Sequence, residues 1–285
     1  MKTNKNHLVE LSLLGTIHAP TLLAPYVITH DGIPKVMPSL GGIVYNFAIG
    51  DNCMDLAGDH IEPGVSLFAD NTRESQALNT LSCVGNQARV VSGDAKDAVG
   101  FVTGKHGGIE HVLCYFPKED LEKMIPGDKI LIKSKGQGLA LTDHPDIHVQ
   151  NLDPELLEKM NIKEEDGKLK VGVKAFIPAH LMGAGQGSSS GYSGDYDIMT
   201  GDAQALSEHG LHELCFGDLV LLQDCDNTFG RQYLKGAATI GIIIHSNCVL
   251  SGHGPGVTTL LTSKKGLLEG FFDENANLKG LMGVE

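Results

Sequence analysis

The stretch NQARVVSGDAKDAVGFVTGKHGGIEHVLCYF, residues 86–116, decides the fold. It contains three short apolar runs that are separated by a turn at Gly93 and by a Gly-rich turn at 104–108. A further strand begins in MIPGDKILIKSKGQG, residues 124–138, directly after a Pro-Gly-Asp turn. Short strands with glycine corners are typical of small barrels, so we predict an SH3-like barrel over residues 81–145.

The sequence on either side of this segment also predicts mostly strands. Residues 1–80 form an N-terminal β region, in which His-Asp-Gly at 30–32 predicts a hairpin and 51–80 is irregular. Residues 146–285 form a C-terminal β-rich domain that includes a Gly/Ser loop at 183–194, either a lid or a spacer. The predicted fold class is therefore mainly β, an SH3-like barrel plus a further β-rich domain with a few short helices.

Three segments have helical patterns. Residues 117–125 and 153–161 predict short helices, the second with Asp153 as N-cap and Pro154 as its first residue. Residues 202–214 predict one helix despite Gly210.

Composition restricts the function. The 285 residues carry a net charge of −13, which opposes nucleic-acid binding because phosphate contacts need cations. The six cysteines form no C-x-x-C pair and the N-terminus lacks a signal-peptide pattern, so we expect free thiols in the cytoplasm. No run of about 18 apolar residues is present, so we expect no membrane span.

The stretch GIIIHSNCVLSGHGPG, residues 241–256, contains two candidate site histidines. His245 ends an apolar strand, where a hydrogen-bonded structural histidine is the ordinary outcome, and His253 lies in a Gly-rich corner. The spacing of that corner is not a dinucleotide fingerprint, although Gly252 and Gly254 offer backbone N–H groups to an anion.

Paired carboxylates follow another strand. Asp224 and Asp226 come after GDLVLLQ, and a spacing of two places both on one face of an extended chain. Such a pair binds a hard cation, shares a proton, or simply caps the turn. A metal-dependent enzyme would combine these residues as follows: Asp224, Asp226, His245 and His253 as ligands of a divalent metal, Asp224, Asp226 and His253 in catalysis, and Asp195, Asp197, Gly252, Gly254 and Arg231 in ligand binding.

Three other polar clusters have ordinary explanations. In the cluster of Asp51, Asp55, Asp59, His60 and Glu62, carboxylates four apart would repel one another on a helix face; a bound cation or a solvated surface would explain them, and we expect the solvated face. We expect Lys105-His106 and Glu110-His111 to form a polar hairpin tip. His209 and His212 are three apart and suit a metal only on a continuous helix, so a surface pair is the expectation.

Several segments together resemble a known family. GDAKDAVGFVTGKHGGIEHVL, DPELLEKM, DCDNTFGR and TIGIIIHS…GHGPGVTTLLTS are similar to the bacterial and archaeal family called domain of unknown function 4438. The resemblance spans nearly the whole chain and implies an SH3-like barrel with further β-rich parts. It does not indicate any particular activity. The pattern from Val90 to Val102 also resembles the KOW motif of barrels that bind RNA.

A weaker resemblance is to the acetamidase/formamidase family. Gly194-Asp195-Tyr196-Asp197 is similar to the Gly-Asn-x-Asp element of those enzymes, with Asp195 where the family has Asn. The family's Gly-Asp-Gly-Glu segment is absent, which opposes its metal site and amide chemistry here.

Three functions stay open. The first is a metal-dependent enzyme, a hydrolase of a small polar, amide-like metabolite. The second is a non-catalytic small-molecule or anion-binding protein. The third is an RNA-associated barrel with a basic stripe of Arg89, Lys105, Lys133 and Lys135. We also expect a homo-oligomer, because the irregular 51–80 segment needs a surface to pack on.

Overall fold

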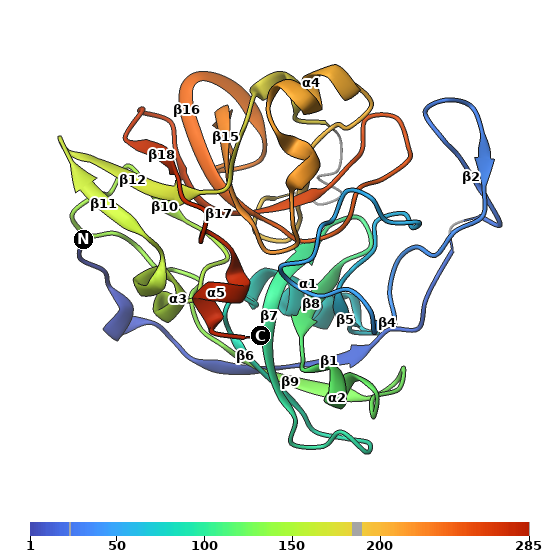
Figure 1. The fold of residues 1–285 in the computed structure, drawn as a ribbon. Coiled ribbons are helices and arrows are strands. Elements are labelled where there is room, and N and C mark those ends of the chain that lie inside the picture. The colour runs from blue at the N-terminus through green and yellow to red at the C-terminus, as the bar shows by residue number, and fades with distance from the viewer. Residues whose placement is uncertain (23, 184–189, 285) are drawn as a thin grey trace.

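A closed β barrel forms one half of the molecule. The computed structural model describes residues 1–22, 24–183 and 190–284, and the barrel lies in the lower half of Figure 1. Its six antiparallel strands follow the order β1-β9-β6-β7-β8-β5, and β5 pairs back with β1 to close the ring. The strands are β1 (Leu11–Ile17), β5 (Gly64–Phe68), β6 (Gln87–Val90), β7 (Val99–His106), β8 (His111–Tyr115) and β9 (Lys129–Ser134), with β4 (Ile43–Val44) added to β5. The predicted barrel is confirmed.

The barrel takes strands from beyond the segment 81–145. β1 and β5 come from the N-terminal region, so residues 1–80 and 81–145 build the barrel together. The prediction that 51–80 is irregular was wrong in its second half, which contains β5 and the helix α1 (Thr72–Leu81). The Asn71 side chain caps that helix by accepting from two backbone N–H groups of its first turn.

Strand β7 lies between the two halves of the molecule. Strands β6 and β9 alternate buried and exposed residues, as expected of a barrel wall, whereas only the first residue of β7 is exposed. The outer face of β7 packs against the C-terminal half, where a Cβ on Gly104 would lie 2.1 Å from Ile244. The last residue of this strand, His106, is therefore at the junction of the two cores.

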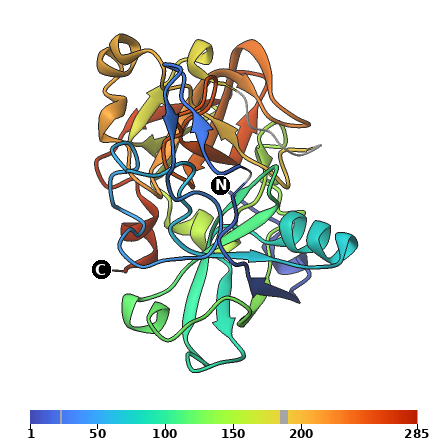
Figure 2. The same cartoon turned by 90° about the vertical axis from the view of Figure 1, so that its right-hand side faces the viewer.

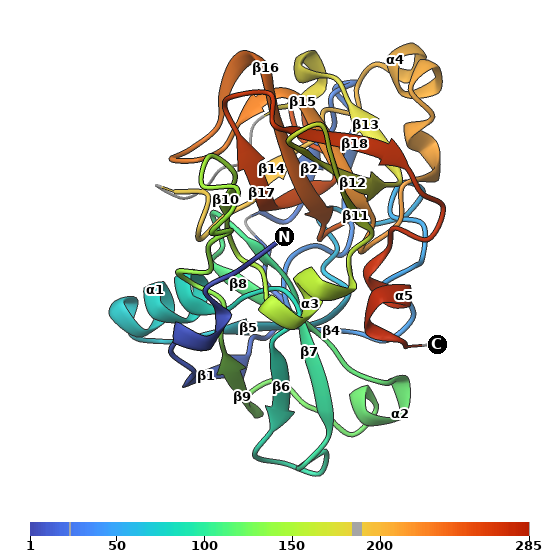
Figure 3. The ribbon, with the colours of Figure 1, turned by 90° about the vertical axis from the view of Figure 1, so that its left-hand side faces the viewer.

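The C-terminal half consists of two β sheets. A six-stranded sheet has the order β10-β17-β16-β15-β13, with β14 paired to β17, and a three-stranded sheet has the order β11-β12-β18 (Figure 3). The strands are β10 (His148–Val149), β11 (Ile162–Glu165), β12 (Lys168–Val173), β13 (Ala175–Ile177), β14 (Tyr196–Asp197), β15 (Leu219–Asp226), β16 (Gln232–Ile243), β17 (Gly256–Ser263) and β18 (Leu268–Phe272).

The helices are short. The short helices predicted at 117–125 and 153–161 both exist, as α2 (Lys118–Leu121) and α3 (Pro154–Lys159). The side chain of Asp153 caps α3. The single helix predicted at 202–214 was wrong: α4 (Ala203–Glu208) ends before Gly210, whose φ of 64° is left-handed and interrupts the helix. The remaining helices are the 3₁₀ turns η1 (Lys5–His7), η2 (Ala179–Leu181) and η3 (Leu211–Glu213), and α5 (Leu278–Met282). No helix among the described residues has the length and apolar character to cross a membrane.

A hairpin arm extends along the upper half of the molecule (Figure 2). It comprises the described residues between 22 and 40, and its strands β2 (Val27–Ile28) and β3 (Pro34–Lys35) pair antiparallel. The predicted hairpin at 30–32 is thus confirmed. The arm is attached to the C-terminal half by a hydrogen bond from the N–H of His30 to the carbonyl of Val249.

Candidate metal centre

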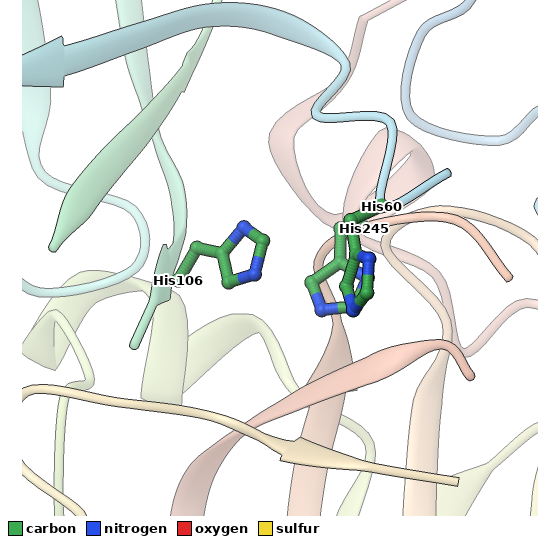
Figure 4. Close-up of side chains that lie close together, drawn as sticks. All are labelled: His60, His106 and His245. Atoms are coloured by element: carbon green, nitrogen blue, oxygen red, sulfur yellow. The ribbon is translucent and has the colours of Figure 1, made fainter. Parts of the chain in front are cut away.

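Three histidines from distant parts of the sequence meet between the barrel and the C-terminal sheets. Figure 4 shows His106, at the end of β7, opposite His60 and His245. The ring of His106 lies 4.3 Å from that of His245, centroid to centroid, and the His60 and His245 rings are 4.9 Å apart. One ring nitrogen of each lies within 4.8 Å of the others, a spacing that suits shared coordination of one ion.

Two buried carboxylates complete the cluster. Asp195 and Asp197 flank Tyr196 at β14, which pairs with the start of β17. The Nε2 atom of His245 lies 3.0 Å from Oδ2 of Asp195 and 3.6 Å from Oδ1 of Asp197. These three residues form a second group with ligand atoms within 4.8 Å of one another, so His245 belongs to both groups.

The hydrogen bonds of His245 leave one nitrogen without a donor or acceptor partner. Its Nδ1 lies 2.9 Å from the carbonyl of Ser246, so Nδ1 carries the proton and donates it. Nε2 faces Oδ2 of Asp195 without hydrogen-bond geometry, and neither atom has another hydrogen-bond partner among the described residues. The other Asp195 oxygen accepts from the N–H of Gly107 at 2.8 Å.

Buried polar atoms are rarely left in this state, because each would lose its hydration without compensation. Burial lowers the pKa of His245, but the facing carboxylates of Asp195 and Asp197 outweigh it and hold that pKa well above its usual value. Either a proton on Nε2 or a metal ion bound by both groups satisfies the pair, and a metal ion fits the donor set of imidazole nitrogen and carboxylate oxygen.

Gly256 leaves the space in which these two atoms meet. A Cβ at this position would lie 2.1 Å from Oδ2 of Asp195 and 2.3 Å from Nε2 of His245. Any side chain here would therefore displace the two candidate ligand atoms.

Glu62 orients His106 from behind. Its Oε1 lies 2.6 Å from Nδ1 of His106, while His111 Nδ1 lies 2.9 Å from Oε2. A carboxylate at Nδ1 directs the Nε2 lone pair of a histidine toward a metal, as in carboxylate–histidine–zinc arrangements. Burial raises the pKa of Glu62, but the two histidines outweigh it and hold that pKa well below the usual range. His18 continues this series of hydrogen-bonded side chains, since its Nδ1 lies 2.7 Å from Nε2 of His111.

His60 and His253 lie on the accessible side of the cluster. His253 Nδ1 is 2.7 Å from Oδ2 of Asp197, and its side chain is 31% exposed. His60 Nδ1 is 3.2 Å from Oδ2 of Asp59, and the φ of His60 is 53°, a left-handed conformation that residues other than glycine adopt uncommonly. Burial opposes the charge on His60, but hydrogen bonds to Asp197 and Asp59 raise its pKa to about 11. Cys248 lies close enough to form a third group with these two histidines.

Comparisons with known proteins agree with the resemblance seen in the sequence. Residues 26–158 match the N-terminal domain of unknown function DUF4438, and residues 159–282 match its C-terminal domain. The chain belongs to the DUF4438 family. The crystal structure of TM1086 is similar over 97% of both chains, with 50% sequence identity and a TM-score of 0.93. No curated protein matches the sequence.

The carboxylate pair singled out in the sequence lies elsewhere in this DUF4438 protein. Asp226 contacts Thr228, Gln232 and Lys264, and Asp224 accepts from the N–H of Gly236. Neither joins a group of metal-capable side chains among the described residues. The expectation that both lie on one strand face was wrong, because a bulge interrupts the register between Gln223 and Cys225 and gives Asp224 a φ of 52°.

Of the other site residues predicted from the sequence, some lie in the cluster and some do not. His245, His253, Asp195 and Asp197 come together, whereas Arg231 is exposed and donates to the carbonyl of Gly183. Gly254 approaches another segment closely, since a Cβ there would lie 1.8 Å from the Ile198 carbonyl, and Gly252 has open space around it. Residues 184–189 of the Gly/Ser loop at 183–194 lie outside the described residues, so the choice between lid and spacer stays a prediction.

Two clusters interpreted as surface features belong to the DUF4438 site instead. Asp59 and Glu62 are buried, which corrects the expected solvated face for these two residues, whereas Asp51 and Asp55 are exposed as expected. Lys105, His106 and His111 are also buried, which corrects the expected hairpin tip. A usable signal was present in VTGKHGGIEHVL, where the histidines continue apolar strand runs rather than interrupting them.

Proposed function

We propose that this DUF4438 protein is a divalent-metal-dependent enzyme that hydrolyses a small amide-like metabolite. The observation that carries the proposal is the facing pair of His245 Nε2 and Asp195 Oδ2, which are buried, 3.0 Å apart and without any other hydrogen-bond partner among the residues that the structure describes. A bound cation accounts for this pair, for the glycine at 256 and for the carboxylate behind His106.

The donor set indicates the class of metal. His106 and His245 would supply nitrogen, and Asp195 and Asp197 would supply oxygen, with His60 next to them. A mixed nitrogen and oxygen set suits Zn²⁺, Mn²⁺ or Fe²⁺ better than Mg²⁺ or Ca²⁺, which prefer oxygen alone.

Hydrolysis is the reaction that this arrangement supports best. A metal held by histidine and carboxylate lowers the pKa of a bound water and polarises a substrate carbonyl. His253 is partly exposed and bonded to Asp197, so it is the proposed general acid or base. A metal-polarised carbonyl is the group that such a centre hydrolyses, so an amide-like substrate fits the arrangement; the acetamidase/formamidase likeness of Gly194–Asp197 does not itself support this, because the family's Gly-Asp-Gly-Glu segment is absent.

The two alternative functions have less support. An anion-binding site built from backbone amides would avoid carboxylates, whereas Asp195 and Asp197 converge here. The basic stripe of an RNA-binding barrel would include Lys105, which is 0% exposed and bonded to Asn151.

Metal analysis of the purified protein tests the proposal. Wild-type protein should retain about one or more equivalents of a transition metal or zinc after dialysis, and His245→Ala should lose it. Asp224→Ala is the matched control and should keep wild-type metal content, because the side chain of Asp224 accepts from the N–H of Gly236 on β16 and lies in no metal-capable group among the described residues. The metal-loaded protein should then release ammonia from members of a panel of primary amides. Equally little metal in wild type and His245→Ala would refute the metal site, and metal binding without turnover would leave a non-catalytic binding protein.

A further inference from the structure

A pocket of about 370 Å³ opens directly onto the proposed metal centre. Its inner end is polar and includes His60, His106, His253 and Asp197. This volume lies at the small end of the range for ligand pockets, roughly 300–1,000 Å³.

The outer end of the pocket is apolar and is built mainly by the hairpin arm. Its apolar lining includes Tyr26, Val27, Met37 and Leu40 from the arm, with Ile109 and Leu250 opposite. A single ligand in this pocket would therefore contact charged groups at one end and hydrocarbon at the other.

The segment after β3 turns alternate residues to the pocket. Lys35, Met37 and Ser39 line the pocket, whereas Val36 does not and is 79% exposed. Val36 is therefore a control position next to Met37 in the same segment.

The polar groups at the inner end restrict the ligand further. The carboxylates of Asp59 and Asp197 line the pocket but are paired with His60 and His253, so this end is polar and already partly charge-balanced. An oxygen-bearing head, such as an amide or other acyl group, suits this end because it offers the metal a ligand atom.

We propose that the ligand is a small amphipathic acyl compound, with its oxygen head at the metal and a hydrocarbon body against the arm. This inference rests on the proposed function and adds the substrate class to it. Its specific claim is that the arm contributes binding energy through the length of the hydrocarbon body.

Alkyl hydroxamic acids test this claim, because the hydroxamate head chelates metals and the chain can be lengthened one methylene at a time. We would titrate zinc-loaded protein with acetohydroxamic, butanohydroxamic and hexanohydroxamic acids by calorimetry. Affinity should rise about fourfold for each methylene buried. Met37→Ala and Leu250→Ala should reduce this increase while leaving acetohydroxamic acid binding unchanged, and Val36→Ala should retain it.

The outcomes separate the inference from the proposed function. Equal affinity for all three compounds, or equal effects of Met37→Ala and Val36→Ala, would overturn the inference while zinc-dependent binding of acetohydroxamic acid preserves the metal centre. If acetohydroxamic acid binds no better to zinc-loaded wild type than to His245→Ala, the proposed function fails and this inference fails with it.

Discussion

Glu62 is a residue whose effect on the site is indirect. It is buried and bonds to His106 and His111, and it also accepts from the N–H of Gly41 and the hydroxyl of Ser66. Its carboxylate accepts from Nδ1 of His106 and so fixes the tautomer in which Nε2 is available. A neutral side chain of the same shape would keep the packing and lose that effect.

We therefore predict that Glu62→Gln lowers metal affinity by about 10- to 100-fold, as other partners of metal-bound histidines do. Competition with a chromophoric chelator would measure it. Glu110→Gln is the control, because Glu110 is exposed and bonds to Ser75 outside the site. Wild-type affinity in Glu62→Gln would show that His106 is not a ligand.

Gly256 provides a steric test of the same centre. Gly256→Ala should reduce metal content sharply and destabilise the fold by about 1–3 kcal/mol, because the new methyl group overlaps Asp195 and His245. Gly201→Ala is matched to it, since a Cβ at Gly201 meets nothing within 4 Å. Metal analysis and urea denaturation of both variants would make the comparison. Full metal content in Gly256→Ala would exclude an ion between those two side chains.

Residue-scale prediction from the sequence succeeded where the chemistry was local. His245 and His253 drew attention because one ends an apolar run and the other lies in a Gly-rich corner, and both are in the cluster. Asp224 and Asp226 were placed on one face by the period of two, which a single bulge broke. His60 could not be placed at all, because its neighbours come from segments about 140 and 190 residues away.

At the scale of elements, the position of one glycine sets the end of a helix. The pattern of 202–214 is helical in composition, yet Gly210 adopts a φ of 64° and separates α4 from η3. The strand predictions were more reliable, because the alternation of buried and exposed residues in β6 and β9 largely follows the alternation of apolar and polar residues in the sequence.

Gly210→Ala should therefore lower the free energy of unfolding by about 1–2 kcal/mol, because alanine disfavours the left-handed backbone conformation that Gly210 adopts. Side-chain clashes do not contribute, because a Cβ at Gly210 meets nothing within 4 Å. Gly210→Asn should cost less, as asparagine tolerates this conformation. Urea denaturation would measure both variants. A variant as stable as wild type, or one that fuses α4 and η3 by circular dichroism, would contradict the assigned break.

At the scale of the whole molecule, closure of the barrel depends on the pairing of β1 with β5, which no local sequence pattern predicts. β1 and β5 are separated by about 50 residues, and their contact converts an open sheet into a closed one. The same closure brings the segment around His60 to the end of β7, where the C-terminal sheets supply His245. The site is therefore a product of tertiary assembly, and destabilising either half should loosen it.

The buried thiols predict how stability of the whole molecule depends on pH. Burial raises the pKa of Cys83 to about 12 and raises that of Cys114 well above the ordinary thiol value. Both thiols keep their proton in the folded state at pH values where the unfolded chain has lost it. Their contribution to stability is therefore complete below about pH 8.5 and declines as the pH rises toward 12, by about 1.4 kcal/mol per pH unit for each cysteine.

Urea denaturation between pH 8 and 11 should show this decline, and Cys83→Ala should reduce its slope by about 1.4 kcal/mol per pH unit. The slope isolates the titration, because the cavity left by the substitution changes stability equally at every pH. Ser82→Ala is the control: it removes a neighbouring buried hydroxyl that does not titrate in this range, so its slope should equal that of wild type. Parallel curves for wild type and Cys83→Ala would mean that water reaches Cys83 in the folded protein, and the complete burial of that thiol would then need revision.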